Sequence, residues 1–309
     1  MAGSADSSSR SDAVWSDGAA YIDGGYCPID EAKISVLDWG LTRSDCTYDV
    51  VHVWEGRFFR LETHVDRFLR GLDRLHLELP HDRDGLKAIL QECVRRSGLR
   101  EAYVSMTCTR GRPPAGNRDP RACVNNFYCF AIPFVWITTP EQQRTGVPLY
   151  ISDIPRIAPE SVDPTVKNYH WMDMEMALWE AFEQGSQLVV LRDGAGNISE
   201  GPGYNVFALH DGRWLTPGRG TLEGVTRGTV IELCGELGVA VEVGDLTAEV
   251  LRSADEVIAT STAGGIMPVT TVDGELVGEG RPGVESMRLH ALYWAKHADP
   301  TWSTAVDYG

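Results

Sequence analysis

Residues 163–173 read DPTVKNYHWMD and place one lysine, Lys167, among aromatic, acidic and small residues. Val166 precedes this lysine, and Tyr169 and Trp171 follow closely. Partial desolvation by such neighbours lowers the pKa of a lysine and makes its neutral amine available to attack a carbonyl. The stretch therefore favours Schiff-base chemistry at Lys167. The alternative is a structural lysine near a helix start that extends its charge into solvent.

Three further motifs supply polar groups at the ends of predicted elements. In ISEGPGYNVF, Glu200 lies between a β run and a Gly-Pro-Gly bend, which would hold a carboxylate at a strand end. In LEGVTRGTVIEL, Val225 and Thr226 open a helix whose unpaired N–H groups and dipole bind phosphate. In TSTAGG, Ser261 and Thr262 end an apolar strand and form a second anion cradle with two glycines. The alternatives are a turn acid, a helix N-cap and a strand-to-turn exit, respectively.

The motif HVDR sets Arg67 one helical turn after His64, where its guanidinium is available for a bidentate contact with a phosphate. A surface salt bridge is the alternative for Arg67. Together with Lys167 and Glu200, these groups are the parts of a pyridoxal phosphate site: an amine for the aldehyde, a carboxylate for the ring nitrogen and donors for the phosphate. The sequence therefore predicts pyridoxal 5'-phosphate as the cofactor.

The composition excludes some classes of partner. The chain has 309 residues, of which 43% are hydrophobic and 23% charged, enough for one large core or two ordinary ones. Its formal charge of −16 opposes nucleic acid and anionic membranes as partners. No apolar run approaches the roughly 20 residues of a membrane-spanning helix, and the opening MAGSADSSSRSD lacks an apolar signal core. We therefore expect a cytoplasmic protein.

The cysteines and histidines indicate neither disulfides nor a metal centre. The 7 cysteines are odd in number and include no CxxC pair, which is typical of free thiols in a reducing compartment. His64, His76 and His81 lack the HxxxH and HExxH spacings of zinc sites. We expect no bound metal.

Hydrophobic periodicity predicts an α+β fold with mixed sheets, because hairpins outnumber βαβ units. EAYVSMTCTR is predicted as a half-buried strand, and YNVFALHDGRWLT as a hairpin that turns on Asp211-Gly212. One helix is predicted after LEGVT, and the others cover about 62–77, 84–97, 169–184 and 283–297. The predicted divisions are a disordered tail (1–12), a small N-terminal α/β domain (13–137), an interdomain linker (138–146) and a larger C-terminal cofactor-binding domain (147–309).

Taken in order, HVDR, VKNYHW, ISEGPGYN, LEGVTRGTV and TSTAGGIMPVTTVDG resemble the motifs of class IV aminotransferases. These are the fold-type IV pyridoxal phosphate enzymes, which include branched-chain and D-amino-acid transaminases and aminodeoxychorismate lyase. The likeness runs from about Ala20 to the C-terminus. Within the family the sequence is most similar to the (R)-selective amine transaminases, through EAKISVLDWG, SDCTYDVVHVWEGRFFRLETHVDR and STAGGIMP. The resemblance implies the two-domain fold of D-amino-acid and branched-chain aminotransferases.

By this resemblance, Lys167 forms the Schiff base with the cofactor and Glu200 contacts the pyridine nitrogen. An (R)-amine would donate its amino group to a keto acid such as pyruvate, with Lys167 moving the proton. The family's habit implies a homodimer with the site between domains and loops that reach in from the partner. The implied phosphate contacts are Arg67, Val225, Thr226, Ser261 and Thr262.

The loop TRGRPPAGNRDPRA bears on substrate choice, because its Pro and Gly content suits a movable arm. In the resembling family one arginine of this loop takes the keto-acid carboxylate. Ungapped counting places that position at Gly116, so Arg118 is the nearest candidate, and Arg110, Arg112 and Arg121 are the alternatives. By resemblance, the pocket is lined by Tyr48, Val50, Tyr103, Ser105 and Trp171, although aromatic residues at such spacing also form plain core.

Arg43 departs from the family pattern, because the (R)-amine enzymes usually carry histidine before SD.TY. A fixed cation there would clamp a carboxylate and shift the preference toward D-amino acids; the alternative is an arginine that points outward. Two rival functions therefore stay open. One is a D-amino-acid or branched-chain transaminase, and the other is a non-catalytic binding module that has kept the scaffold.

Overall fold

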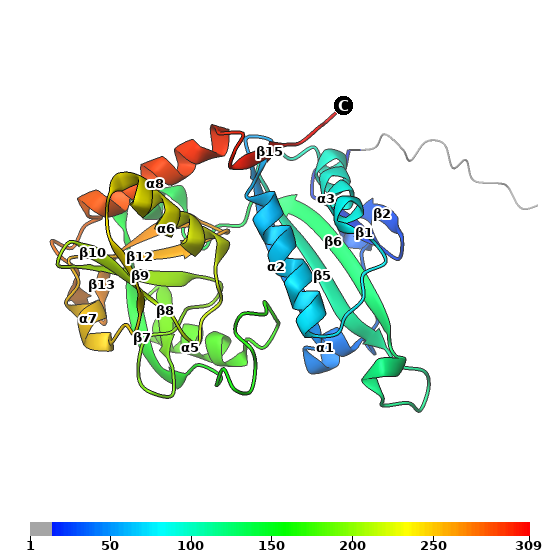
Figure 1. Cartoon of the computed structure of the whole chain (residues 1–309), viewed down its shortest axis with the longest axis horizontal. Coiled ribbons are helices and arrows are strands. Elements are labelled where there is room, and N and C mark those ends of the chain that lie inside the picture. Colours follow the sequence, from blue (N-terminus) through cyan, green and yellow to red (C-terminus); the bar gives the residue numbers. More distant parts are fainter. Residues whose placement is uncertain (1–13) are drawn as a thin grey trace, which may run out of the picture. The chain divides into compact units, whose positions relative to one another are not determined.

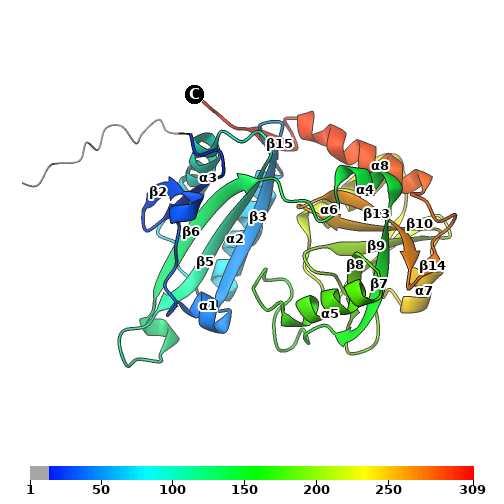
Figure 2. The ribbon, with the colours of Figure 1, turned by 180° about the vertical axis from the view of Figure 1, so that it is seen from behind.

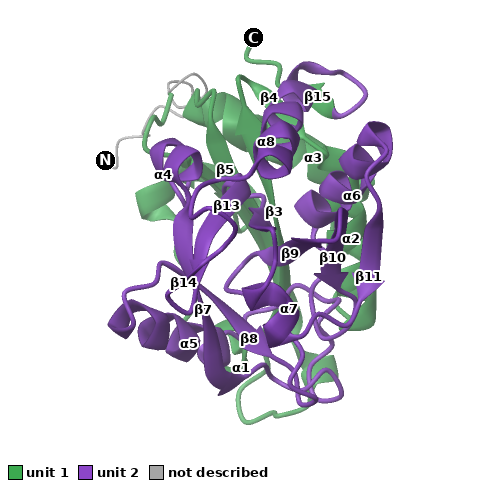
Figure 3. Ribbon diagram, turned by 90° about the vertical axis from the view of Figure 1, so that its left-hand side faces the viewer, with its two compact units in different colours: residues 1–134, 303–309 green, residues 135–302 purple. Residues whose placement is uncertain are grey.

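The computed structural model of the chain describes residues 14–309 (Figure 1). It divides into two compact units: unit 1 holds the described part of residues 1–134 together with 303–309, and unit 2 holds residues 135–302 (Figure 3). The predicted disordered tail, 1–12, lies outside the described residues.

Unit 1 is built on a seven-stranded antiparallel sheet with the strand order β15-β4-β3-β5-β6-β1-β2. Helices α2 and α3 pack on one face of this sheet (Figures 1 and 2). Its strands are β1 (Ala19–Ile22), β2 (Gly25–Pro28), β3 (Cys46–Trp54), β4 (Arg57–Phe59), β5 (Ala102–Arg112), β6 (Val124–Pro133) and β15 (Ser303–Ala305). Its helices are α1 (Trp39–Arg43), α2 (Leu61–Arg74) and α3 (Arg83–Ser97), with the short 3₁₀ helices η1 (Ile29–Glu31) and η2 (Pro120–Ala122).

The core of unit 1 follows from helical spacing on α2 and alternation on the strands. Leu61, Val65, Phe68 and Leu72 recur every three or four residues along α2 and are buried against the sheet. Burying one such side chain stabilises the fold by roughly 1.5–3 kcal/mol. Helix α3 ends at Ser97, and Gly98, with a positive φ of 67°, provides its left-handed cap.

Unit 2 contains an eight-stranded mixed sheet with the order β11-β10-β9-β12-β13-β7-β8, and β14 pairs with β13. The hairpin of β9 and β10 turns on Asp211 and Gly212, both with positive φ, as predicted. The strands are β7 (Val147–Pro155), β8 (Leu188–Arg192), β9 (Asn205–His210), β10 (Arg213–Pro217), β11 (Val241–Gly244), β12 (Glu256–Ser261), β13 (Gly265–Val272) and β14 (Glu275–Leu276). The helices are α4 (Pro140–Thr145), α5 (Met172–Glu183), α6 (Val225–Leu237), α7 (Ala248–Arg252), α8 (Val284–Ala295) and the 3₁₀ helix η3 (Lys296–Ala298).

The division between the units differs from the predicted boundaries in two ways. The chain passes from unit 1 to unit 2 between Phe134 and Val135, and the stretch predicted as a linker, 138–146, forms α4 in unit 2. Its polar residues are a helix start, because Thr139 and Gln142 form a reciprocal capping box. The C-terminal segment returns to unit 1, since β15 pairs with β4, a long-range contact that periodicity does not reveal.

The prediction that β5 is half-buried is wrong. Ala102, Val104, Met106 and Cys108 enter the core as expected, but the alternate residues Ser105, Thr107 and Thr109 are also buried. The strand lies inside the sheet between β3 and β6, where cross-strand side chains shield small hydroxyl residues. Polar character therefore does not mark a solvent face on this strand.

Candidate active site

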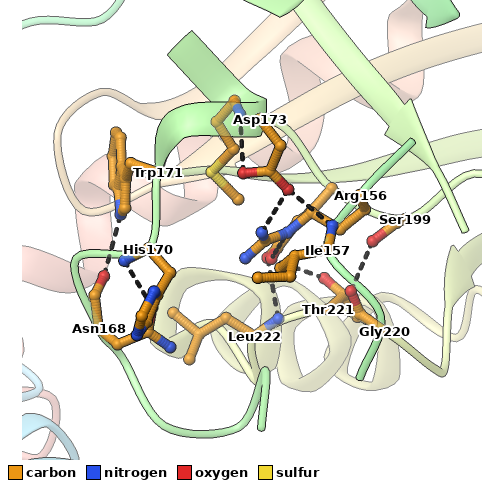
Figure 4. A network of polar contacts seen from close by, with 12 residues as sticks. Arg156, Ile157, Asn168, His170, Trp171, Asp173, Ser199, Gly220, Thr221 and Leu222 are labelled. Carbon is orange, nitrogen blue, oxygen red and sulfur yellow. Dashed lines mark hydrogen bonds and ion pairs between the residues drawn. The ribbon is translucent and has the colours of Figure 1, made fainter. Parts of the chain in front are cut away.

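Lys167 lies in a loop just before α5, and its side chain is half-buried. Asn168 shapes this loop: its Oδ1 accepts from the His170 N–H at 2.9 Å, and its Nδ2 donates to the Val166 carbonyl at 2.8 Å. Trp171 adds a bond from Nε1 to the Asn168 carbonyl at 3.0 Å (Figure 4). Side-chain bonds of this kind compete with helix formation, which explains why α5 begins at Met172 and not near the predicted 169.

Glu200 is buried among donors. Its Oε2 accepts from the Leu222 N–H at 2.8 Å and from the Thr221 hydroxyl at 3.2 Å, while Oε1 accepts from Nε of Arg156 at 3.2 Å. Burial raises the pKa of this carboxyl, and the Arg156 charge and the three hydrogen bonds oppose the rise without cancelling it. These contacts fix the Glu200 carboxyl group in the connection between β8 and β9, and its role toward a cofactor stays a prediction.

Sequence reasoning missed Arg156, which links the Lys167 segment to Glu200. Its Nη1 donates to Oδ2 of Asp173 at 2.7 Å, and the Ile157 N–H donates to the same oxygen (Figure 4). The only local signal is an arginine that directly follows the apolar strand β7, a position where a buried cation needs an acid partner.

The first turn of α6 offers backbone donors. Val225 and Thr226 are buried, the helix has no side-chain cap, and its first turn carries no acid. Its cap, Gly224, packs so closely that an added Cβ would lie 2.0 Å from Oδ1 of Asn205. The first N–H groups of a helix have no intrahelical acceptor, so this turn suits a phosphate.

Ser261 and Thr262 end β12 at a tight turn. The Ser261 hydroxyl donates to the Gly203 carbonyl at 2.8 Å and accepts from the Ala263 N–H at 3.1 Å. Trp171 approaches the same glycine, because a Cβ on Gly203 would lie 3.3 Å from its ring. The turn that carries Ser261 and the Trp171 side chain therefore meet at Gly203 within unit 2.

In unit 1, Arg67 is buried and does not form the surface salt bridge that was its alternative reading. Its Nε and Nη2 donate to the two oxygens of Asp49 at 2.7 and 2.9 Å, and Nδ1 of His64 lies 2.8 Å from Oδ1 of the same carboxylate.

Four of the five predicted pocket residues share one face of unit 1. Directly opposed residues of an antiparallel pair point to the same side of a sheet. That face lies opposite the hydrophobic core, and most of its side chains are buried. The register of β3 and β5 pairs Tyr48 with Thr107, Val50 with Ser105 and His52 with Tyr103. The fifth residue, Trp171, belongs to unit 2.

Arg43 is exposed at the end of α1, and its guanidinium carbon lies 3.4 Å from the ring centroid of Trp39. This stacking holds the cation against its own helix.

Acidic partners divide the four loop arginines into two pairs. Arg110 is held by both oxygens of Asp45, and Arg121 pairs with its neighbour Asp119. Arg112 and Arg118 are exposed and form no ion pair within residues 14–309. Arg112 also lines a cleft of about 790 Å³ in unit 1, which is formed mainly by residues 33–35, 37–39, 111–117 and 124–126 and does not include Arg118.

The described part of the chain contains no group of three or more His, Cys, Asp or Glu that could hold a metal ion. His81 contacts the Tyr21 hydroxyl at 3.2 Å, and His76 adopts a positive φ at the end of α2. No helix among residues 14–309 is long and apolar enough to span a membrane.

These groups fit a pyridoxal phosphate cofactor by their chemistry: an amine in a defined loop, a buried carboxylate suited to a protonated ring nitrogen, and an uncapped helix start without acids for a dianion. The fold and the site thus define a pyridoxal-phosphate-dependent transferase. Residues 47–272 match the family described as amino-transferase class IV, and the chain belongs to that family.

Relatives with aminotransferase names are similar to this chain over most of its length. A Methanocaldococcus jannaschii protein with a branched-chain-amino-acid aminotransferase name is 30% identical over 87% of this chain and 93% of its own length. The D-alanine aminotransferase of Bacillus licheniformis is 29% identical over 82% of this chain and 88% of its own length.

Among solved structures, a T.th. branched-chain amino acid aminotransferase with pyridoxamine 5'-phosphate has a TM-score of 0.88 at 28% identity and covers 94% of this chain and 99% of its own. The Escherichia coli branched-chain amino acid aminotransferase has a TM-score of 0.89 at 26% identity, with the same two coverages. The predicted fold class, enzyme class and cofactor are therefore confirmed.

Proposed function

We propose that this class IV aminotransferase moves an amino group from an (R)-amine to a keto acid such as pyruvate. The observation that carries the proposal is the charge of the buried face shared by β3 and β5. The eight paired positions on that face, all within the described residues, hold no lysine or arginine: Cys46, Tyr48, Val50, His52, Tyr103, Ser105, Thr107 and Thr109.

A neutral face suits a donor without a carboxylate. An amino-acid donor would bring a charged carboxylate to its pocket, and a buried carboxylate without a fixed cation costs several kcal/mol. An aryl or alkyl amine has no such requirement, and the rings of Tyr48 and Tyr103 offer apolar contacts. The placement of Arg43, exposed and stacked on Trp39, is also consistent with a donor that needs no permanent clamp.

The cofactor contacts proposed here are those of the sequence resemblance. Lys167 supplies the amine for covalent attachment, and Glu200 faces the ring nitrogen. Arg156 acts on the ring nitrogen only through Glu200. Arg67, Val225, Thr226, Ser261 and Thr262 contact the phosphate.

Lys167 and Glu200 then each have a defined task in the reaction. Pyridoxal phosphate, when bound, supplies the electron sink that lets an amino group pass from donor to acceptor. Nζ of Lys167 removes the proton from the donor carbon and later delivers one to the acceptor carbon, as nucleophile, base and acid in turn. Glu200 holds the proton at the ring nitrogen by charge, and each pKa unit of that preference corresponds to about 1.4 kcal/mol.

The acceptor keto acid does carry a carboxylate, so a movable cation is needed in the second half of the reaction. Arg118 is the proposed contact, because it is exposed in the loop between β5 and β6 and has no ion pair among residues 14–309. Arg112 meets the same conditions and is the alternative. Arg110 and Arg121 are held by acids and are disfavoured.

The alternative function is a D-amino-acid or branched-chain amino-acid transaminase. The names of the Bacillus licheniformis and Methanocaldococcus jannaschii relatives favour it. The test is the initial rate with (R)-α-methylbenzylamine, D-alanine and L-leucine as donors, each with pyruvate and α-ketoglutarate as acceptors. We expect the amine to give the highest kcat/KM with pyruvate; a clear preference for D-alanine or L-leucine would establish the alternative.

We further propose a homodimer. Helix α5 exposes an apolar stripe of Met172, Met176, Trp179 and Phe182, spaced three or four residues apart. Such a contiguous exposed stripe is typical of an association surface, and closed twofold dimers are the commonest assembly. A cytoplasmic location is proposed with it, because all seven cysteines are free thiols.

A further inference from the structure

Asp49 is an acid where the sheet should be apolar. On β3 it alternates with Val51 and Val53 toward the face that α2 covers, and both of those residues belong to the hydrophobic core. Its exposed fraction is 0%, so its carboxylate has no access to water. A charge in that position requires partners that replace its hydration.

The partners form a complete set. Asp49 Oδ1 accepts from the Val50 N–H at 2.7 Å, from Nη2 of Arg67 at 2.9 Å and from Nδ1 of His64 at 2.8 Å, while Oδ2 accepts from Nε of Arg67 at 2.7 Å. Burial alone raises the pKa of Asp49, but the Arg67 charge and the His64 hydrogen bond outweigh it and hold that pKa well below its usual range. The carboxylate is therefore ionised, and because an ionised carboxylate only accepts, Nδ1 of His64 carries the proton.

A contribution to stability alone does not account for the buried ion pair of Asp49 and Arg67. Replacing a buried ion pair by well-packed apolar residues is often neutral or stabilising, so two aliphatic side chains would join α2 to β3 equally well. What the pair provides that aliphatic residues cannot is a guanidinium with a fixed plane. The two-point contact through Nε and Nη2 fixes that plane and directs the Nη1 side of Arg67 away from the carboxylate.

We propose that Asp49 is a positioning residue for cofactor binding, which orients Arg67 for the phosphate. The inference rests on the proposed role of Arg67 in the function above. An arginine side chain loses about 2 kcal/mol of rotamer freedom when it is fixed, and Asp49 imposes that cost during folding and not during binding. The opposite effect is also physical: the negative charge of Asp49 repels a phosphate, so removing it could tighten binding. Removing Asp49 should therefore weaken cofactor binding if the first effect prevails and tighten it if the second does, so the measured affinity distinguishes them.

The experiment measures the dissociation constants of pyridoxal phosphate and of pyridoxal, which lacks the phosphate, for the apo form of the full chain. The variants are Asp49→Asn, Arg67→Lys and the double variant. Val51→Ala is the matched control, because it disturbs the same buried strand and face but removes no polar partner of Arg67. If Asp49→Asn does not fold, Asp49→Ser takes its place, since its hydroxyl still accepts one hydrogen bond and leaves room for water.

We expect Asp49→Asn to weaken pyridoxal phosphate binding about tenfold, as is common when the partner of a ligating side chain is removed, and to leave pyridoxal binding unchanged. In the Arg67→Lys background the same change should have no further effect, because Asp49 acts through the guanidinium. Val51→Ala should bind both compounds as the unmodified chain does.

Two results would overturn the inference. Tighter or unchanged pyridoxal phosphate binding in Asp49→Asn would show that charge repulsion or a purely structural role prevails, and an equal loss for both compounds would indicate general damage to the fold. Failure of the proposed function would give a distinct result in the unmodified chain, which would then bind neither pyridoxal phosphate nor pyridoxal, or would bind both equally.

Discussion

The Nε atom of Arg156 lies 3.2 Å from Oε1 of Glu200, and both side chains are buried. The contact sets a fixed positive charge beside the carboxylate that is proposed to face the ring nitrogen of the cofactor. Burial raises the pKa of Glu200, and Arg156 is the largest influence against that rise. Arg156 therefore holds Glu200 closer to its ionised form than an apolar neighbour would.

Replacing Arg156 by methionine should impair the reaction through Glu200. The change Arg156→Met keeps the length of the side chain and removes its charge, so the pKa of Glu200 should rise further. A protonated Glu200 no longer stabilises a protonated ring nitrogen, and each lost pKa unit costs about 1.4 kcal/mol, or tenfold in rate. We expect kcat to fall about tenfold or more, and its acid limb to move to higher pH.

The measurement for Arg156→Met is kcat as a function of pH. Arg192→Met is the control, because Arg192 on β8 pairs with the exposed Asp153 and does not contact Glu200. If the acid limb lies at the same pH in Arg156→Met and in the unmodified chain, Arg156 does not influence the ionisation of Glu200.

Removing the amine at position 167 should abolish turnover. We expect Lys167→Ala to bind pyridoxal phosphate without forming a covalent bond and to show no measurable transamination. Borohydride reduction followed by mass spectrometry of a tryptic digest should give an adduct on Lys167 in the unmodified chain and none in the variant. Lys87→Ala, which removes a partner of Glu62, should react as the unmodified chain does. An adduct on another lysine would contradict the assignment.

Local patterns sufficed for the elements that local chemistry decides. Gly98 ends α3, and Asp211 and Gly212 turn the hairpin, because a left-handed backbone is a property of one or two residues. Motifs also indicated Lys167 and Glu200, since each lies in a loop of unusual composition, and their roles toward the cofactor stay predictions.

Long-range pairing explains what the sequence did not reveal. Arg156 contacts Glu200 and Asp173, which are 44 and 17 residues away in the sequence, and its position after the apolar strand β7 does not identify either partner. Asp49 is joined to Arg67 across 18 residues and two elements. Partners of buried charges are set by tertiary packing, so composition and periodicity do not identify them.

The stability contributed by Asp49 should depend on pH in a defined direction. Its folded pKa lies below the ordinary value of 3.8, so its contribution is present above the unfolded pKa and is lost as pH falls through the folded one. We expect Asp49→Asn to lower the free energy of unfolding at neutral pH by about 3 kcal/mol, and this difference to shrink below about pH 4.

Urea unfolding at several pH values measures the Asp49 contribution. Asp66→Asn is the control, because it removes an exposed partner of Arg83 and should cost less than about 1 kcal/mol. A difference for Asp49→Asn that stays constant down to strongly acid pH would mean that the carboxylate is not ionised in the folded chain.

Self-association should depend on the exposed stripe of α5. Trp179 is 66% exposed and stands between Met176 and Phe182, so it is the largest apolar surface of the stripe. A buried charge at an apolar interface costs several kcal/mol, so Trp179→Glu should weaken the dimer at least tenfold, as measured by sedimentation equilibrium. Val284→Glu, a change at an isolated residue that is 80% exposed on α8, should leave the association constant unchanged. If Trp179→Glu and the unmodified chain have equal dimer dissociation constants, the contact lies on another face. If both variants weaken the dimer, the cause is a general effect of added negative charge on a chain that already carries −16.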